Sequence, residues 1–185
     1  MNPCPPSDPF HEYTKWGSFI PALMACAAFV EDPILEIGVG HFSTPLLHAF
    51  CVSTGRKLIS VEQDADWAAK FEPFLSGNGH CFYVGKYDDL LPKIALRELS
   101  VLAFIDNSHP AGESRVNHFK SLLPVSSFVV VHDYLAENVR DIDPLLKETL
   151  HAFVFDAYAP PTLIASMTTP IPMGLWPMGR HIKVI

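Results

Sequence analysis

Short apolar runs alternate with helix-like segments along most of this chain. The apolar runs are rich in Ile, Leu, Val and Phe, a composition typical of buried strands. The predicted strands are Ile34–Ile37, Lys57–Val61, Cys81–Val84, Val101–Ile105, Ser127–Val131, His151–Ala157 and Thr162–Met167. The predicted helices are His11–Val30, Thr44–Val52, Ala65–Leu75, Leu90–Arg97, Glu113–Leu123 and Asp143–Leu150.

This alternation predicts right-handed β-α-β units and therefore an α/β fold, a single-domain Rossmann-like doubly wound sheet. The sheet is expected to be mostly parallel. Pro160 and Pro161 turn the chain before Thr162–Met167, which we expect to be an antiparallel strand near the C-terminus. The segment Pro170–Arg180 is expected to be a loop that covers the sheet edge; the alternative is a lid or a contact in a homodimer.

The turn after the first predicted strand is the most informative local pattern. An apolar run ends in Glu36, and Gly38 and Gly40 follow at once. Glycine at these positions lets the backbone pass close to a ligand, because no Cβ stands in the way. Ser43 or Thr44 is expected to open the next helix, whose N-terminal amides then face the crevice at the strand ends. The turn therefore predicts a nucleotide-like ligand.

Glu36 narrows the choice of ligand. A dinucleotide fingerprint has three glycines, G-x-G-x-x-G, and directs a helix N-terminus at a pyrophosphate. Here Ser43 takes the place of the third glycine. A carboxylate at position 36 would repel a pyrophosphate and suit a cationic amino-acid group. A nicotinamide-dependent dehydrogenase is therefore the weaker alternative.

The acid-x-Gly-x-Gly turn resembles the first motif of the class I S-adenosylmethionine-dependent methyltransferases. The resemblance implies that S-adenosylmethionine is the cofactor. The resemblance also implies that the cofactor-binding residues of this region are Glu36, Gly38, Gly40, Ser43 and Thr44. On this basis we expect an N-terminal arm and helix over 1–32, a cofactor-binding core over 33–134, and a C-terminal sheet edge and tail over 135–185.

The second predicted strand also ends in an acid. The run from Ser60 to Trp67 is similar to the second motif of the same superfamily. This resemblance implies that Glu62 accepts hydrogen bonds from the ribose hydroxyls and that Gln63 lies beside the adenine. The alternative is that Glu62 is a charge at a helix N-terminus. Trp67 is expected to belong to the core rather than to contact the cofactor.

The turn after the third predicted strand departs from the superfamily pattern. Relatives commonly carry an acid there that flanks the adenine, whereas this chain has Lys86. Tyr87 or Asp88 is expected to take that role. The alternative is a solvated turn in which Asp88 or Asp89 caps the next helix.

The fourth and fifth predicted strands end in further polar groups. The tract that begins at Asp106 and contains His109, and the later run His132-Asp133-Tyr134, resemble the small O-methyltransferase-like branch of the superfamily. This resemblance implies O-methylation of a small-molecule acceptor. The catalytic residues that we expect are Asp106, His109 and Asp133, and Asp106 is also expected to contact the cofactor.

Two chemistries are open to these groups. Asp106 and Asp133 emerge from adjacent strands and could hold a divalent ion such as Mg²⁺, with His132 completing a site for a transition ion. In catechol-type relatives an asparagine follows the second aspartate as a ligand, but here that place is Tyr134. Alternatively His109 is a general base for an acceptor hydroxyl. The structural alternatives are that His109 caps a helix and that His132 packs in the core.

Composition limits the partners. The chain has 13 Lys and Arg against 20 Asp and Glu, a net charge of −7, and no basic cluster, so a nucleic-acid partner is not expected. The four cysteines lack C-x-x-C spacing, which argues against a zinc site and favours a reducing, cytoplasmic compartment. The apolar stretch Phe19–Val30 is too short to span a bilayer. Lys86 and Tyr134 also support an alternative function, a non-catalytic S-adenosylmethionine- or nucleoside-binding or scaffold protein that retains the fold.

Overall fold

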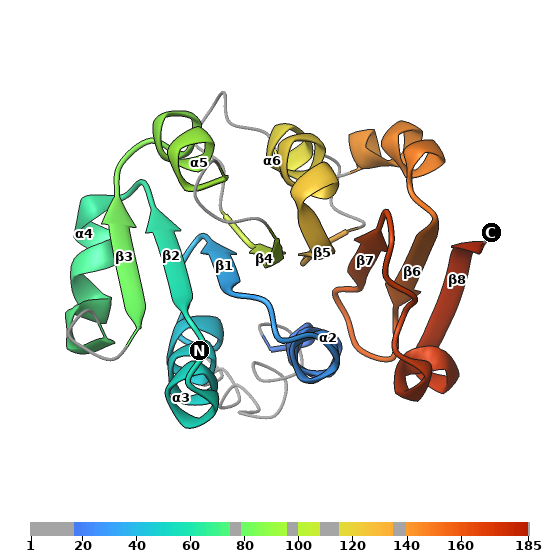
Figure 1. Ribbon diagram of the computed structural model, residues 1–185, viewed down its shortest axis with the longest axis horizontal. Coiled ribbons are helices and arrows are strands. Elements are labelled where there is room, and N and C mark those ends of the chain that lie inside the picture. The colour runs from blue at the N-terminus through green and yellow to red at the C-terminus, as the bar shows by residue number, and fades with distance from the viewer. Residues whose placement is uncertain (1–16, 75–78, 96–99, 108–114, 135–139, 185) are drawn as a thin grey trace, which may run out of the picture.

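A computed structural model describes residues 17–74, 79–95, 100–107, 115–134 and 140–184. An eight-stranded sheet with the strand order β3-β2-β1-β4-β5-β7-β6-β8 runs through the centre of this structure (Figure 1). The strands are β1 Ile34–Ile37, β2 Leu58–Glu62, β3 His80–Val84, β4 Val101–Ile105, β5 Ser126–Val131, β6 His151–Phe155, β7 Thr162–Ser166 and β8 Gly179–Val184.

The first five strands form a parallel sheet, because each of the pairs β1–β2, β2–β3, β1–β4 and β4–β5 is parallel. β7 is antiparallel to both β5 and β6, and β8 is antiparallel to β6. The expected Rossmann-like doubly wound sheet with an antiparallel strand near the C-terminus is therefore confirmed. The strand order reverses between β1 and β4. In such sheets, the ligand crevice lies at the carboxyl ends of the strands that meet at this point.

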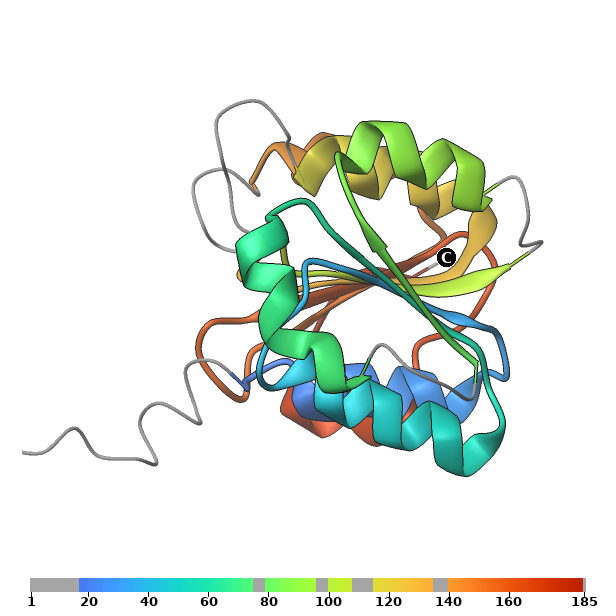
Figure 2. The ribbon, with the colours of Figure 1, turned by 90° about the vertical axis from the view of Figure 1, so that its left-hand side faces the viewer.

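Helices cover both faces of the sheet (Figures 1 and 2). One face carries α2 Ile20–Phe29, α3 Ser43–Thr54 and the 3₁₀ helix η4 Met173–Met178. The other carries α5 Tyr87–Ala95, α6 Arg115–Leu122 and the 3₁₀ helix η3 Arg140–Glu148. The short α4 Ala65–Ala68 and η1 Ala69–Phe74 lie beside β3, and η2 Leu123–Val125 leads into β5.

Each face of the sheet has its own apolar layer. Leu35, Ile37 and their neighbours pack against α5, α6 and η3, and Ile34 packs with α2 and α3 on the opposite face. Every residue of β1, β4 and β5 is buried, as expected of parallel strands covered on both faces. The charged side chain buried within these strands is Glu36 of β1, which has no exposed surface.

The structure corrects three predicted elements. The N-terminal helix begins at Ile20 with Pro21 in its first turn, where a missing N–H is tolerated; the start of the predicted helix, from His11, lies outside the described residues. The helix predicted over Asp143–Leu150 is the 3₁₀ helix η3, which contains Pro144. The segment predicted to be a loop over the sheet edge forms η4 and the start of β8 instead, so it supplies the edge strand itself.

None of the described helices has the length and apolar character that a membrane span needs. Cys26, Cys51 and Cys81 are free thiols, and Cys4 lies outside the described residues.

Candidate functional site

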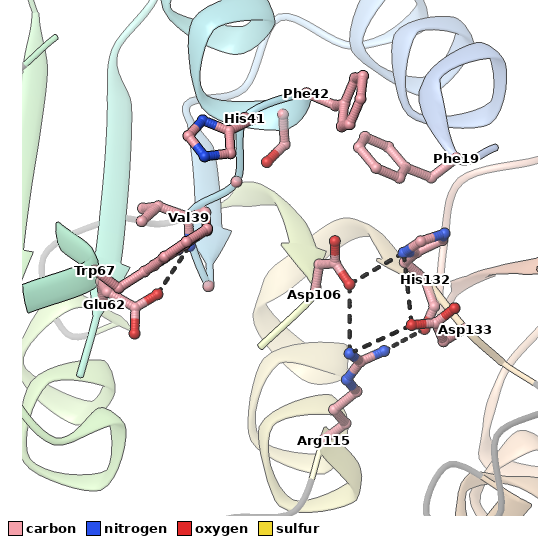
Figure 3. Close-up of a pocket in the computed structure, with 13 residues that line it drawn as sticks. Phe19, Val39, His41, Phe42, Glu62, Trp67, Asp106, Arg115, His132 and Asp133 are labelled. Carbon is pink, nitrogen blue, oxygen red and sulfur yellow. Dashed lines mark hydrogen bonds and ion pairs between the residues drawn. The ribbon is translucent and has the colours of Figure 1, made fainter. Parts of the chain in front are cut away.

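A cavity of about 410 Å³ opens at the carboxyl ends of the central strands (Figure 3). The turn after β1 contributes the consecutive residues 38–43, from Gly38 to Ser43. β2 contributes its last residue, Glu62, and the helix that follows contributes Trp67. The ends of β4 and β5 contribute Asp106, His132 and Asp133. Phe19 before α2 and Arg115 at the start of α6 complete the lining. The cavity therefore lies where the reversal of the strand order predicts a ligand site.

Gly38 is required by its contact with β4. Its φ is +85°, and a Cβ on it would lie 2.5 Å from the Cα and 2.6 Å from the backbone nitrogen of Asn107. No side chain fits there, because both contacts are with backbone atoms. The turn after β1 thus packs directly on the end of β4, which brings Val39 and Asp106 to one cavity.

Glu36 stabilises the same turn through hydrogen bonds on the side away from the cavity. Its Oε1 accepts a hydrogen bond from Thr44 Oγ1 at 3.0 Å, and its Oε2 accepts one from Ser60 Oγ at 2.6 Å. Thr44 Oγ1 in turn accepts a hydrogen bond from the Gly40 N–H at 3.0 Å. Burial raises the pKa of Glu36 to about 7; hydrogen bonds from Ser43, Ser60 and Thr44 oppose this rise, and the charge of Asp106 adds to it. Glu36 and Thr44 therefore support the turn and do not line the cavity.

Stability should depend on pH through Glu36. Its pKa is about 7 in the folded protein against 4.5 for a solvent-exposed glutamate, so between these pH values the folded chain keeps a proton that the unfolded chain releases. The stabilisation of the fold by this proton is complete below pH 4.5. It is lost, by about 3 kcal/mol in the free energy of unfolding, as pH rises through about 7. Glu36→Gln should remove this fall, measured by urea unfolding at about pH 5 and about pH 8.

Glu72→Gln is the matched control, because Glu72 is an exposed glutamate of η1. It should unfold with the pH dependence of the unaltered protein. Equal pH dependence in Glu36→Gln and the unaltered protein would contradict the proposed origin of the effect.

Glu62 joins the turns after β1 and β2. Its Oε2 accepts a hydrogen bond from the Val39 N–H at 3.1 Å, and its Oε1 accepts hydrogen bonds from the N–H groups of Gln63 at 2.8 Å and Asp64 at 2.9 Å. The residue is 6% exposed and lines the cavity. Trp67 lines the cavity too, against the expectation of a core position, and donates from Nε1 to the Val39 carbonyl at 2.7 Å.

The structure brings some of the predicted cofactor-binding residues to the cavity and not others. Those that line it are Gly38, Gly40, Ser43, Glu62 and Asp106. Tyr87 is buried in the core, where its hydroxyl donates to Glu62 Oε1 at 3.3 Å. Asp88 is exposed on α5, and Gln63 is partly exposed outside the lining. Cofactor contacts of Glu36, Thr44, Gln63, Tyr87 and Asp88 stay predictions.

Four charged side chains meet on one wall of the cavity, and Figure 3 shows them pointing toward one another. Asp106 Oδ1 lies 3.3 Å from Arg115 Nη2 and 3.0 Å from His132 Nδ1. Asp133 Oδ2 lies 3.8 Å from each of the same two nitrogens. Each carboxylate therefore faces two nitrogen donors. We call Asp106, Arg115, His132 and Asp133 the charged cluster.

Arg115 is fixed within this cluster. It is 6% exposed, and it donates from Nε to the Asn107 carbonyl at 2.9 Å and from Nη1 to the His132 carbonyl at 2.6 Å. Arg115 was not among the predicted site residues. A signal was available, because Arg115, His118, Phe119 and Leu122 have the spacing of one helix face, and all are buried.

Both ring nitrogens of His132 have oxygen partners. Ser18 Oγ donates its one proton to the Pro160 carbonyl at 2.7 Å, so it can only accept from His132 Nε2, 3.0 Å away. His132 Nδ1 lies 3.0 Å from the Asp106 carboxylate. These two contacts fix the orientation of the ring, which lines the cavity.

The charged cluster contains a candidate metal site. Ligand atoms of Asp106, His132 and Asp133 all lie within 4.8 Å of one another, close enough to hold one cation. Arg115 Nη2 lies 3.3 Å from Asp106 Oδ1 and 3.8 Å from Asp133 Oδ2, so a positive charge already faces both carboxylates. Metal binding by the three residues stays a prediction.

Tyr134 and the backbone of Asp133 bear on the other predictions for this region. The hydroxyl of Tyr134 donates to Asp143 of η3, and burial raises the pKa of Tyr134. Tyr134 therefore does not take the place of the ligand asparagine of catechol-type relatives. Asp133 has a positive φ of 55°, an uncommon backbone conformation that clusters at functional sites. His109, the expected base, lies outside the described residues.

No protein-family model matches the sequence, and no curated protein is similar enough in sequence to be matched. Solved structures, in contrast, match most of the chain. The O-methyltransferase TomG from Streptomyces achromogenes, involved in tomaymycin synthesis and solved with SAM, has a TM-score of 0.59 and 20% identity over 79% of this chain and 78% of that chain. Cofactor-bound Rv0187 from MTB has a TM-score of 0.58 and 18% identity over 83% of this chain and 80% of that one.

The methyltransferase MycE of the mycinamycin biosynthetic pathway, solved with Mg, SAH and mycinamycin VI, gives a TM-score of 0.52 at 12% identity. The match covers 88% of this chain and 50% of MycE. At these identities the likeness shows the fold alone. The chain has the Rossmann-like fold of S-adenosylmethionine-dependent methyltransferases, several of which are O-methyltransferases.

Proposed function

We propose that this protein is an S-adenosylmethionine-dependent methyltransferase that methylates an oxygen of a small-molecule acceptor. The observation that supports this best is the cavity in which the glycine turn and Glu62 face the charged cluster. In a doubly wound sheet this is the place for the ligand. The net charge of −7 and the absence of a basic cluster favour a small acceptor over a nucleic acid.

The residues that would hold the cofactor lie on one side of the cavity. When bound, S-adenosylmethionine supplies a methyl group on a sulfonium. Glu62 would accept hydrogen bonds from ribose hydroxyls, because its carboxylate lines the cavity at the end of β2. The turn from Gly38 to Ser43 would pass beside the ligand, and Asp106 and Asp133 would provide negative charge near a cation.

The charged cluster would orient the acceptor. Asp106 and Asp133 are the more exposed members, with side chains 23% and 33% accessible, and they can accept hydrogen bonds from an acceptor hydroxyl. Methyl transfer is an in-line displacement that gains most from such positioning. His109 stays the predicted base that would remove the hydroxyl proton. Arg115 supplies a positive charge beside the carboxylates, and Asp106, His132 and Asp133 are the residues that would hold a divalent ion.

Calorimetric titration with S-adenosylmethionine, S-adenosylhomocysteine and NAD is the first test. We expect both sulfur ligands to bind and NAD not to bind. Methyl transfer to a panel of hydroxylated small molecules, with and without EDTA, is the second. Loss of activity in EDTA that Mg²⁺ restores would indicate a metal held by Asp106, His132 and Asp133. Binding without transfer would indicate the non-catalytic alternative, and binding of NAD alone would overturn the proposal.

Glu62→Ala should weaken S-adenosylhomocysteine binding by about 1–3 kcal/mol, because it leaves ribose hydroxyls without a partner in a partly buried site. Calorimetric titration measures the change. Asp66→Ala is the matched control: it removes an exposed carboxylate four residues along the chain, so it should bind with unchanged affinity. Equal affinities in the two variants would rule out the ribose contact.

A further inference from the structure

A chain of polar side chains runs from Glu36 toward the surface of α3. Glu36 Oε2 lies 2.6 Å from Ser60 Oγ, Ser60 Oγ lies 2.9 Å from His80 Nε2, and His80 Nδ1 lies 3.2 Å from His48 Nδ1. Glu36, Ser60 and His80 come from the adjacent strands β1, β2 and β3, and His48 is a partly exposed residue of α3. The first three are buried. We call these four residues the buried relay; none of them lines the cavity.

The relay has one consistent direction when Glu36 is ionised. Ser60 donates its only proton to Glu36, so its oxygen must accept from His80 Nε2. The neutral His80 ring then has an acceptor at Nδ1, which His48 Nδ1 must supply with a proton. Every donor in the chain points toward the carboxylate.

The direction reverses when Glu36 carries a proton. The proton belongs on Oε2, because its partner Ser60 has a second neighbour, His80 Nε2, to which it can donate instead. Ser60 then accepts from Glu36 and must donate to His80 Nε2. His80 therefore moves its own proton to Nδ1 and donates to His48. One proton taken up by Glu36 thus changes the tautomer of a histidine two strands away.

We infer that Ser60, His80 and His48 are positioning residues that act through Glu36 on the glycine turn, as a hydrogen-bond relay whose direction reports the protonation of Glu36. The turn is the target because Glu36 contacts Thr44, and Thr44 holds the Gly40 N–H. None of these contacts involves the charged cluster, so the relay is a separate device.

Other titratable groups near Glu36 favour the same interpretation. Asp106, at the end of β4, adds a like charge that favours a proton on Glu36. Cys51 of α3 also interacts electrostatically with Glu36, but burial raises the pKa of its thiol to about 11, so it stays uncharged at neutral pH. The raised pKa of Glu36, about 7, allows the relay to change direction near neutrality.

The relay predicts a pH-dependent preference between ligands; this part rests on the proposed function. S-adenosylmethionine carries a sulfonium, and S-adenosylhomocysteine is the corresponding neutral thioether. Their other groups are the same, so the ratio of their affinities isolates the effect of the sulfonium charge. An ionised Glu36 beneath the turn should favour the cation. The ratio should rise as pH increases through neutrality, and it should not rise in Glu36→Gln.

Nuclear magnetic resonance of the ligand-free protein tests the relay itself. The ¹³C shift of the Glu36 carboxyl gives its titration, and ¹⁵N shifts give the tautomer of His80. We expect His80 to carry its proton on Nε2 at high pH and on Nδ1 at low pH, with the midpoint of the Glu36 titration. A His80 ring that keeps its Nε2 proton throughout that titration would overturn the inference.

Variants distinguish the relay from an isolated hydrogen bond between Ser60 and Glu36. Ser60→Ala should raise the Glu36 midpoint by about one pH unit, because it removes a donor to the carboxylate. His80→Phe should raise it by less, and the matched control His151→Phe, on β6, should leave it unchanged. An unchanged midpoint in His80→Phe would also overturn the inference. If neither sulfur ligand binds at any pH, the proposed function fails, while the ligand-free titrations still decide on the relay.

Discussion

Gly38→Val should abolish measurable binding of S-adenosylhomocysteine and lower the free energy of unfolding by about 3–5 kcal/mol. Two causes combine. Gly38 has a φ of +85°, and its Cβ would lie 2.5 Å from the Asn107 Cα. The turn could accept a side chain only by moving away from β4, which would pull Val39 from Glu62 and open the cavity wall. Calorimetric titration and urea unfolding measure the two effects.

Gly55→Val separates the causes. Gly55 ends α3 with a φ of +69°, but a Cβ on it would meet no atom within 4 Å. This variant therefore keeps the backbone strain and lacks the collision, and it should cost about 1–2 kcal/mol and leave binding intact. If Gly38→Val loses no more stability than Gly55→Val and binds normally, the contact with β4 is not what requires glycine.

Arg115→Met should lower the free energy of unfolding by about 3–5 kcal/mol, because it leaves the carboxylates of Asp106 and Asp133 short of a buried partner. Methionine keeps much of the length of the arginine stem, so the loss would report the guanidinium. Urea unfolding near neutral pH is the measurement.

The matched control is Arg180→Met. Arg180 pairs with Asp156 at 3.4 Å, but their side chains are 65% and 45% exposed. Solvent screens such a pair, and its loss should cost under about 1 kcal/mol. Similar losses in the two arginine variants would mean that Arg115 does not neutralise the charged cluster.

The fold was largely predictable because its signal is local. Five apolar runs alternate with helical segments, and each run forms a parallel strand. The bounds are close to those predicted: the second strand, expected over Lys57–Val61, is Leu58–Glu62, a shift of one residue. Type of helix was harder to predict. The segment with Pro144 forms a 3₁₀ helix rather than the predicted α-helix.

The candidate site was predictable only in part, because contacts far apart in sequence build it. Glu62, Asp106 and Asp133, which the strand ends pointed to, line one cavity, and their roles stay predictions. Ser18 and His132, in contrast, are 114 positions apart, so no spacing rule connects them. The hydrogen-bond partners of Glu36 were unpredictable for the same reason. The motif identified Glu36 itself, but the hydroxyls that bond to it come from β2 and α3.

The left-handed backbone of Asp133 limits which residues evolution can place there. Aspartate, asparagine and glycine adopt a φ near 55° far more readily than other residues do. Related sequences should therefore keep to these three at this position even where the chemistry has been lost. An alanine there would remove the charge and strain the chain together, so its loss of activity could not be assigned to the carboxylate. Asparagine removes the charge alone and is the informative substitution.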